Sequence, residues 1–74
     1  MKGLIGRRVE ITISGRNKLC EPIFRGIVRE VCGTMIKLFP CSKYLSAGGT
    51  GPENMGHMWF NTESSELISI RELN

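Results

Sequence analysis

The stretch IFRGIVREVCGTMIKLF, residues 23–39, constrains the fold more than any other part of this chain. Its apolar residues change face part-way along, which a long strand with a bend explains. Gly26 is the predicted bend, because a missing side chain lets strands cross closely. Gly33 can adopt a positive φ in a tight turn. The sequence therefore predicts a hairpin of two strands, Ile23–Cys32 and Met35–Phe39.

Three further segments are predicted to be strands. In VEITIS, residues 9–14, β-branched residues alternate with polar ones, which is typical of a half-buried strand. MWFNT, residues 58–62, is a short strand, and NTESSE, residues 61–66, is a turn. LISIREL, residues 67–73, closes the chain. A helix from Thr62 is the alternative there, but two isoleucines separated by one residue fit a sheet better.

The segment between the third and fourth strands, residues 41–58, has no periodicity, and Pro40 is expected to end the third strand. We expect a long loop here, exposed and slack over residues 47–56. Its glycine-rich part, GGTGPENMG, has neither the lysine nor the following helix of a phosphate-binding loop. It is therefore predicted to be a connector, with contact to a ligand or partner as the alternative.

The whole chain of 74 residues is expected to form one domain. Five short strands must close, or nearly close, to protect their edges in so small a protein. The predicted fold is all-β, a small and strongly bent five-stranded antiparallel barrel with the long loop between strands 3 and 4. The predicted core consists of Val9, Ile11, Ile13, Val28, Ile36, Leu38, Ile68 and Ile70.

The composition favours a binding protein over an enzyme. A chain this short has a small core and little room for a deep cleft. Hydrophobic residues make up 41% and charged residues 23%, as in ordinary folded proteins. The odd number of cysteines and the lack of a signal peptide argue against a disulfide framework and for a cytoplasmic protein. No apolar run reaches the length of a membrane span, so no membrane association is expected.

No metal or cofactor is expected. Cys20, Cys32, Cys41 and His57 show none of the paired spacings that zinc sites use. His57 lies in the predicted loop, where the geometry of a nucleophile and its base would be hard to hold.

The basic residues carry the functional prediction. The net charge is +3. Arg25 and Arg29 alternate along one predicted strand and share a face if that strand is regular. A basic sheet face with aromatic residues can hold single-stranded nucleic acid. The predicted phosphate-binding residues are Arg7, Arg25, Arg29 and Lys37, and stacking is predicted for Tyr44 or Trp59. The alternative is a solvated face whose charges Glu10, Glu30 and Glu72 balance.

Three segments together resemble the small β-barrels of the Sm-like and Src-homology-3-like superfamily. FRGIVREVCGTMIKL resembles their second strand, turn and third strand. WFNTESSELISIREL is similar to their last two strands and the one-turn corner between them, and GRRVEITIS resembles the first strand. The resemblance implies a bent five-stranded barrel. The family's uridine pocket is not matched, because residues 30–35 lack its Asp-Asn type of signature. The later Arg-Gly or Lys-His type of motif is also absent, and Asn61-Thr62 stands near its place instead. The usual amino-terminal helix is also missing.

The sequence thus predicts a non-enzymatic module that binds RNA or single-stranded DNA weakly and in a salt-sensitive manner. The alternative is a protein-interaction or assembly module, as in accessory proteins of phages or other mobile elements. Its strand edges would also allow a homo-oligomer.

Overall fold

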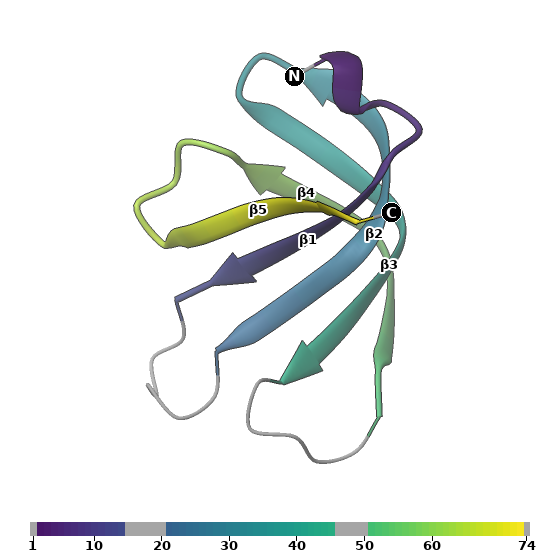
Figure 1. Ribbon diagram of the computed structural model, residues 1–74, viewed down its shortest axis with the longest axis vertical. Helices are drawn as coiled ribbons and strands as arrows, with labels where there is room; N and C mark the ends of the chain where they lie inside the picture. The colour runs from purple at the N-terminus through teal and green to yellow at the C-terminus, as the bar shows by residue number, and fades with distance from the viewer. Residues whose placement is uncertain (1, 15–20, 46–50, 74) are drawn as a thin grey trace.

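The computed structural model describes residues 2–14, 21–45 and 51–73. Over these residues the chain forms five strands in one antiparallel sheet, preceded by one turn of 3₁₀ helix (Figure 1). The elements are η1 (Lys2–Leu4), β1 (Arg8–Ile13), β2 (Pro22–Cys32), β3 (Met35–Leu45), β4 (Glu53–Asn61) and β5 (Leu67–Leu73). The prediction of an all-β fold with five antiparallel strands is confirmed. None of the helices in this part of the chain has the length and hydropathy needed to cross a bilayer.

The order of strands in the sheet is β4-β3-β2-β1-β5. Consecutive strands from β1 to β4 pair with one another, and β5 returns to the free side of β1. Strands β4 and β5 are therefore the two edges, and in the described ranges they do not pair with each other. The sheet is strongly bent, as Figure 1 shows, but the predicted closure into a barrel is not confirmed.

At Gly26, the predicted bend, the backbone of β2 passes close to that of β3. A Cβ atom at this position would lie 2.5 Å from the carbonyl oxygen of Pro40 and 3.2 Å from the Cα of Cys41. The pairing of β2 with β3 is irregular on the carboxyl side of Gly26, around Val28. Only glycine allows this approach, as the sequence predicted. The turn after β2 is also as predicted, because Gly33 has a φ of 60°.

Strand β3 does not end at Pro40, so the prediction of a loop over residues 41–58 is wrong. β3 runs to Leu45 and β4 begins at Glu53. Proline cannot donate a hydrogen bond to a neighbouring strand, but Pro40 lies where the β3–β4 pairing is interrupted, between Leu38 and Cys41. Pairing resumes at Cys41, opposite Gly56 with its φ of 66°. Residues 46–50 of the remaining connection lie outside the described residues.

The core lies on the inner side of the bent sheet. Its buried members are Val9, Ile11, Phe24, Val28, Ile36, Leu38, Cys41 and Phe60. Of the predicted core, Ile13 and Ile70 are only partly buried but pack against it, whereas Ile68 is 51% exposed. The prediction for Ile68 is wrong because the β1–β5 register shifts between Thr12 and Ile13. This shift breaks the strict alternation that placed Ile68 inside.

The close approach at Gly26 gives the first test. Replacing Gly26 by Ala forces a methyl group against the Pro40 carbonyl, and we expect a loss of about 1–3 kcal/mol or more in unfolding free energy. Gly51→Ala is the control, because a Cβ there meets nothing within 4 Å. Urea denaturation measures both variants. Equal stability of Gly26→Ala and wild type would contradict this account of the bend.

Ile36 and Ile68 were both predicted to be core residues, but their substitution should now affect stability to different extents. Ile36 is fully buried and Ile68 is half exposed. We expect Ile36→Ala to cost about 2–5 kcal/mol, while Ile68→Ala stays within roughly 1 kcal/mol. Thermal melting followed by circular dichroism compares them, and similar losses would mean that the face of β5 is misassigned.

Candidate nucleic-acid interface

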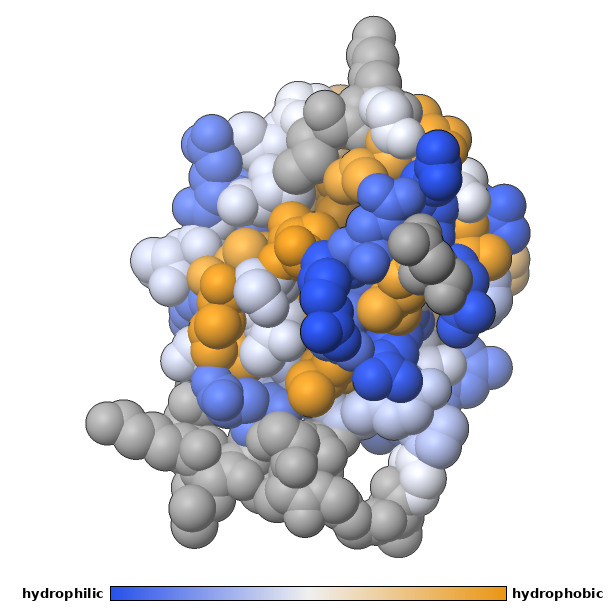
Figure 2. All heavy atoms as spheres, viewed as in Figure 1, coloured by the Kyte–Doolittle hydropathy of each residue, from blue (hydrophilic) through white to orange (hydrophobic). Residues whose placement is uncertain are grey.

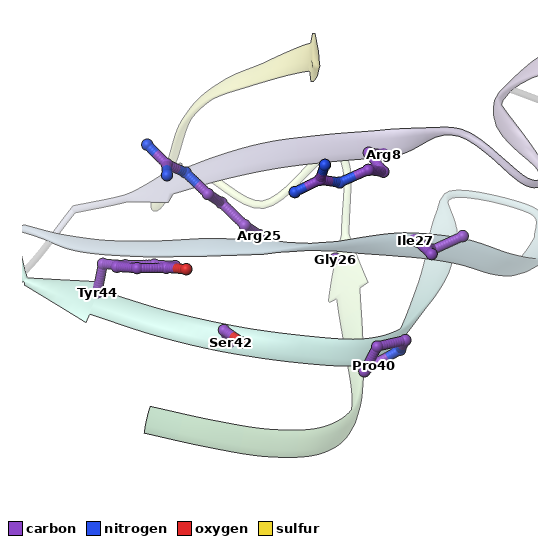
Figure 3. Close-up of a pocket in the computed structure, with 7 residues that line it drawn as sticks. All are labelled: Arg8, Arg25, Gly26, Ile27, Pro40, Ser42 and Tyr44. Carbon is purple, nitrogen blue, oxygen red and sulfur yellow. The ribbon is translucent and has the colours of Figure 1, made fainter. Parts of the chain in front are cut away.

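The outer side of the sheet carries a shallow pocket between β1, β2 and β3, which we call the arginine pocket. It is lined by Arg8, Arg25, Gly26, Ile27, Pro40, Ser42 and Tyr44 and has a volume of about 140 Å³ (Figure 3). Figure 3 shows the two arginines on one side and Pro40, Ser42 and Tyr44 on the other. Two guanidinium groups, two hydroxyl groups and two apolar side chains therefore converge on one hollow.

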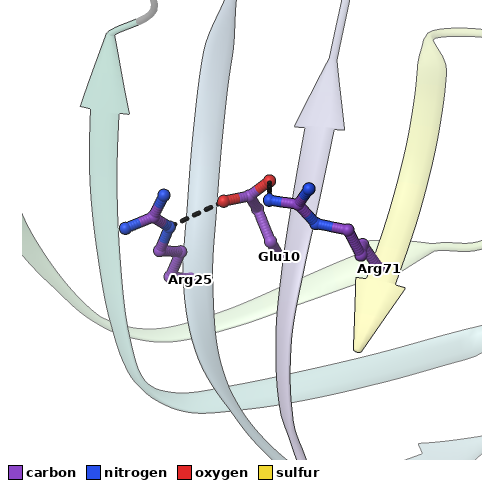
Figure 4. A network of polar contacts seen from close by, with 3 residues as sticks. All are labelled: Glu10, Arg25 and Arg71. Carbon is purple, nitrogen blue, oxygen red and sulfur yellow. Dashed lines mark hydrogen bonds and ion pairs between the residues drawn. The ribbon is translucent and has the colours of Figure 1, made fainter. Parts of the chain in front are cut away.

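Arg25 is fixed at this pocket by two neighbours. Its Nε donates a hydrogen bond of 2.7 Å to Oε2 of Glu10, and its guanidinium carbon lies 4.9 Å from the centroid of the Tyr44 ring. The hydrogen bond to Glu10 raises the pKa of Arg25, against a smaller lowering by desolvation, and the charge of Glu10 and the phenol group of Tyr44 add to the rise. Figure 4 shows the two terminal nitrogens of Arg25 directed away from Glu10. They are therefore available to an anion.

Glu10 is the centre of this arrangement. Its side chain is only 11% exposed, and it accepts a second hydrogen bond of 2.8 Å from Arg71 on β5 (Figure 4). Both arginines are register partners of Glu10 on the neighbouring strands. A nearly buried carboxylate needs such charge-assisted partners, because desolvation penalises an unpaired charge. Glu10 thereby holds the guanidinium of Arg25 in one orientation at the edge of the arginine pocket.

Arg8 is the charged pocket residue that was not among the predicted site residues. Across residues 2–14, 21–45 and 51–73, no ion-pair partner of Arg8 is found. Arg8 pairs in register with Ile27, the outward residue next to the bend. The alternation of the first strand could have indicated it, because Arg8 and Glu10 occupy positions of the same parity.

The structure gives the six predicted site residues different partners. Arg25 and Tyr44 line the arginine pocket. Arg7 pairs with Glu72 at 3.3 Å, and Lys37 pairs with Glu30 at 2.9 Å. All three glutamates offered as balancing charges thus contact a basic residue, which supports part of the alternative of a neutralised face.

Arg29 follows the register shifts near Val28 and has a different hydrogen-bond partner from Arg25. The Nε of Arg29 donates a hydrogen bond of 2.8 Å to the carbonyl oxygen of Phe39. The expected regular alternation of the two arginines is interrupted by register shifts on either side of Val28.

A second group of side chains, which we call the aromatic surface, lies on β3 and β4 and consists of Lys37, Phe39, His57 and Trp59. Lys37 and Trp59 are register partners, with Nζ 5.8 Å from the indole centroid. The rings of Phe39 and His57 are stacked, with centroids 4.0 Å apart. Trp59 is 44% exposed and Phe39 is 39% exposed. The predicted stacking residue Trp59 is therefore accessible, but with partners other than Tyr44.

The thiols lie in contrasting environments. Burial raises the pKa of Cys41 to about 11, so this thiol is protonated at neutral pH and a poor nucleophile. Cys32 is exposed, and Cys20 lies outside the described residues. In the part of the chain that the structure covers, no group of three or more His, Cys, Asp or Glu side chains is placed to hold a metal ion.

Comparison with known proteins adds no family. The sequence matches none of the protein-family models, and a search of the curated proteins finds no match.

The raised pKa of Cys41 predicts a loss of stability in alkali. The contribution of the neutral thiol is fully present below about pH 9 and is lost progressively as the pH rises towards the folded pKa of about 11. Under reducing conditions, we expect the melting temperature to fall more between about pH 7 and about pH 10 in wild type than in Cys41→Ala. Cys32→Ala, at an exposed thiol, should behave like wild type. An identical fall in all three proteins would contradict the assignment.

Proposed function

We propose that this protein is a non-enzymatic module that binds single-stranded RNA or DNA, weakly and with strong salt dependence. The observation that carries the proposal is the arginine pocket, where the unpaired Arg8 and the oriented Arg25 face one hollow. A planar guanidinium matches the oxygens of a phosphate group. Two of them on one side of a pocket therefore favour a phosphodiester as the ligand.

The other pocket residues suit a nucleotide. The hydroxyl groups of Ser42 and Tyr44 can donate to phosphate or sugar oxygens, and Ile27 and Pro40 offer apolar contact to a sugar or base. A single strand is favoured because its sugars and bases are free to enter a small hollow, whereas those of a duplex are stacked and paired.

The surrounding charge supports the same ligand. Arg25 and Arg71 share the carboxylate of Glu10, and Arg8 has no ion-pair partner within the described ranges. This part of the outer face therefore keeps an excess of positive charge, although other basic residues are neutralised. On the face shown in Figure 2, hydrophilic residues lie beside groups of hydrophobic ones.

As part of this proposal, the bent sheet is an incompletely closed member of the Sm-like and Src-homology-3-like small barrels. The five-stranded order, the bend at Gly26 and the tight turn at Gly33 support this assignment. The nucleic-acid site proposed here is not the family's uridine pocket, whose motifs the sequence lacks. A cytoplasmic location fits the free thiol of Cys32.

A second candidate function is protein interaction at the edge strand β4. From Asn54 to Asn61 this strand has no charged side chain apart from the titratable His57. Edge strands without charges or proline are open to pairing with an extended segment of a partner. The exposed Trp59 on β4 would add apolar contact.

Two adjacent arginines provide a matched test of nucleic-acid binding. Arg8→Gln removes an unpaired guanidinium from the pocket, whereas Arg7→Gln removes one that pairs with Glu72 outside it. Fluorescence anisotropy with labelled oligouridine and oligothymidine should give micromolar dissociation constants at about 50 mM salt. Binding should be much weaker at about 200 mM salt. We expect Arg8→Gln to bind with roughly tenfold lower affinity. The slope of log affinity against log salt concentration should fall by about one, as for the loss of one phosphate contact.

Arg7→Gln should change the affinity by less than about threefold, and both variants should melt like wild type. No binding at low salt would refute the proposed function. Equal affinities of the two variants would refute the assignment of the pocket.

A further inference from the structure

The outer side of β3 connects the two surfaces described above. Leu38 and Cys41 are fully buried, while Phe39 and Pro40 between them are both exposed because the pairing with β4 is interrupted there. Pro40 forms a wall of the arginine pocket, and the ring of its neighbour Phe39 stacks on His57 of the aromatic surface. The pocket and the aromatic surface are therefore adjacent rather than on opposite sides of the protein.

We infer that the aromatic surface is a second subsite for the same nucleic-acid strand, on which bases stack while the arginine pocket holds a phosphate. This inference rests on the proposed function and extends it. Nothing in the sequence distinguished two subsites, since it offered Tyr44 or Trp59 for stacking.

The chemistry of the aromatic surface fits nucleobases. The indole of Trp59 and the paired rings of Phe39 and His57 present flat, partly exposed π-systems. Every base has a π-face, so such rings bind bases with little sequence preference. Trp59 and His57 lie two residues apart on the same face of β4, which separates them by about 7 Å.

Cations accompany these rings. Lys37 lies over the indole of Trp59, and the Nε of Arg29 donates a hydrogen bond to the backbone carbonyl oxygen of Phe39. Glu30 neutralises Lys37, but Arg29 has no ion-pair partner within the described ranges. Positive charge next to exposed rings favours a nucleic acid over an apolar segment of a protein.

The length of the path sets the expected footprint. Seven residue steps separate Lys37 from Tyr44 along β3, which is roughly 20 Å of strand. A strand that occupies both subsites therefore covers about four to seven nucleotides. Shorter oligonucleotides reach the arginine pocket alone.

Trp59 provides its own reporter, because it is the only tryptophan of the chain. The experiment titrates oligothymidines of roughly 2 to 12 nucleotides and records both anisotropy and tryptophan fluorescence. We expect the shortest oligonucleotides to bind without quenching Trp59. At about four to seven nucleotides the fluorescence should be quenched and the affinity should rise by roughly tenfold or more.

Trp59→Leu should remove that gain with length and leave the binding of the shortest oligonucleotides unchanged. Ile68→Ala is the control, since Ile68 is also a half-exposed apolar residue but lies on β5. His57→Ala, which keeps the tryptophan reporter, should also reduce the gain and serves if Trp59→Leu does not fold.

The outcomes separate the two proposals. Oligonucleotide binding that depends on Arg8 but shows no quenching and no loss in Trp59→Leu or His57→Ala would overturn the second subsite and leave the proposed function standing. If no oligonucleotide binds, the proposed function itself fails. If light scattering shows an oligomer that Trp59→Leu dissociates while all oligonucleotide affinities stay the same, the aromatic surface is a protein interface and the inference is wrong.

Discussion

The contact between the backbone of Gly26 and the carbonyl of Pro40 is the constraint on which the rest of the structure depends. It lets β2 and β3 cross closely enough for a single sheet to bend around its own core. Among the described residues, one sheet forms the fold, and no second sheet or long helix covers its apolar face. The same crossing leaves Phe39 and Pro40 on the outer side, where they join the arginine pocket to the aromatic surface. Core formation and the candidate site therefore have one geometric origin.

The polar side of the sheet is organised around Glu10 rather than around its arginines. One nearly buried carboxylate orients Arg25 and Arg71 from the two neighbouring strands. Its negative charge reduces the positive charge of the face, but an arginine held in one orientation loses less conformational entropy when it binds a phosphate. A neutralising glutamate and a functional arginine are therefore compatible, whereas the sequence presented them as alternatives.

Local patterns predicted the strands, the bend at Gly26, the turn at Gly33 and the buried residues of regular segments such as Val9 and Ile11. They failed where the pairing is irregular. Ile68 follows an alternation that a register shift in β1–β5 breaks, and Pro40 interrupts the ladder without ending the strand. The arginine pocket could be predicted only in part. Arg8 on β1 and Tyr44 on β3 both line it because β1 and β3 pair with opposite sides of β2. No short segment of sequence shows which strands are neighbours.

The hydrogen bond between Arg71 and Glu10 joins residues 61 positions apart. Because β1 pairs with both β2 and β5, it acquires its second neighbour only after β5 has been synthesised. During translation, Glu10 has at most the partner on β2, and β1 remains an edge. Such long-range pairing raises the contact order of the fold, which slows folding relative to chains of local contacts. This small sheet is therefore expected to assemble in one late cooperative step rather than strand by strand as the ribosome delivers it.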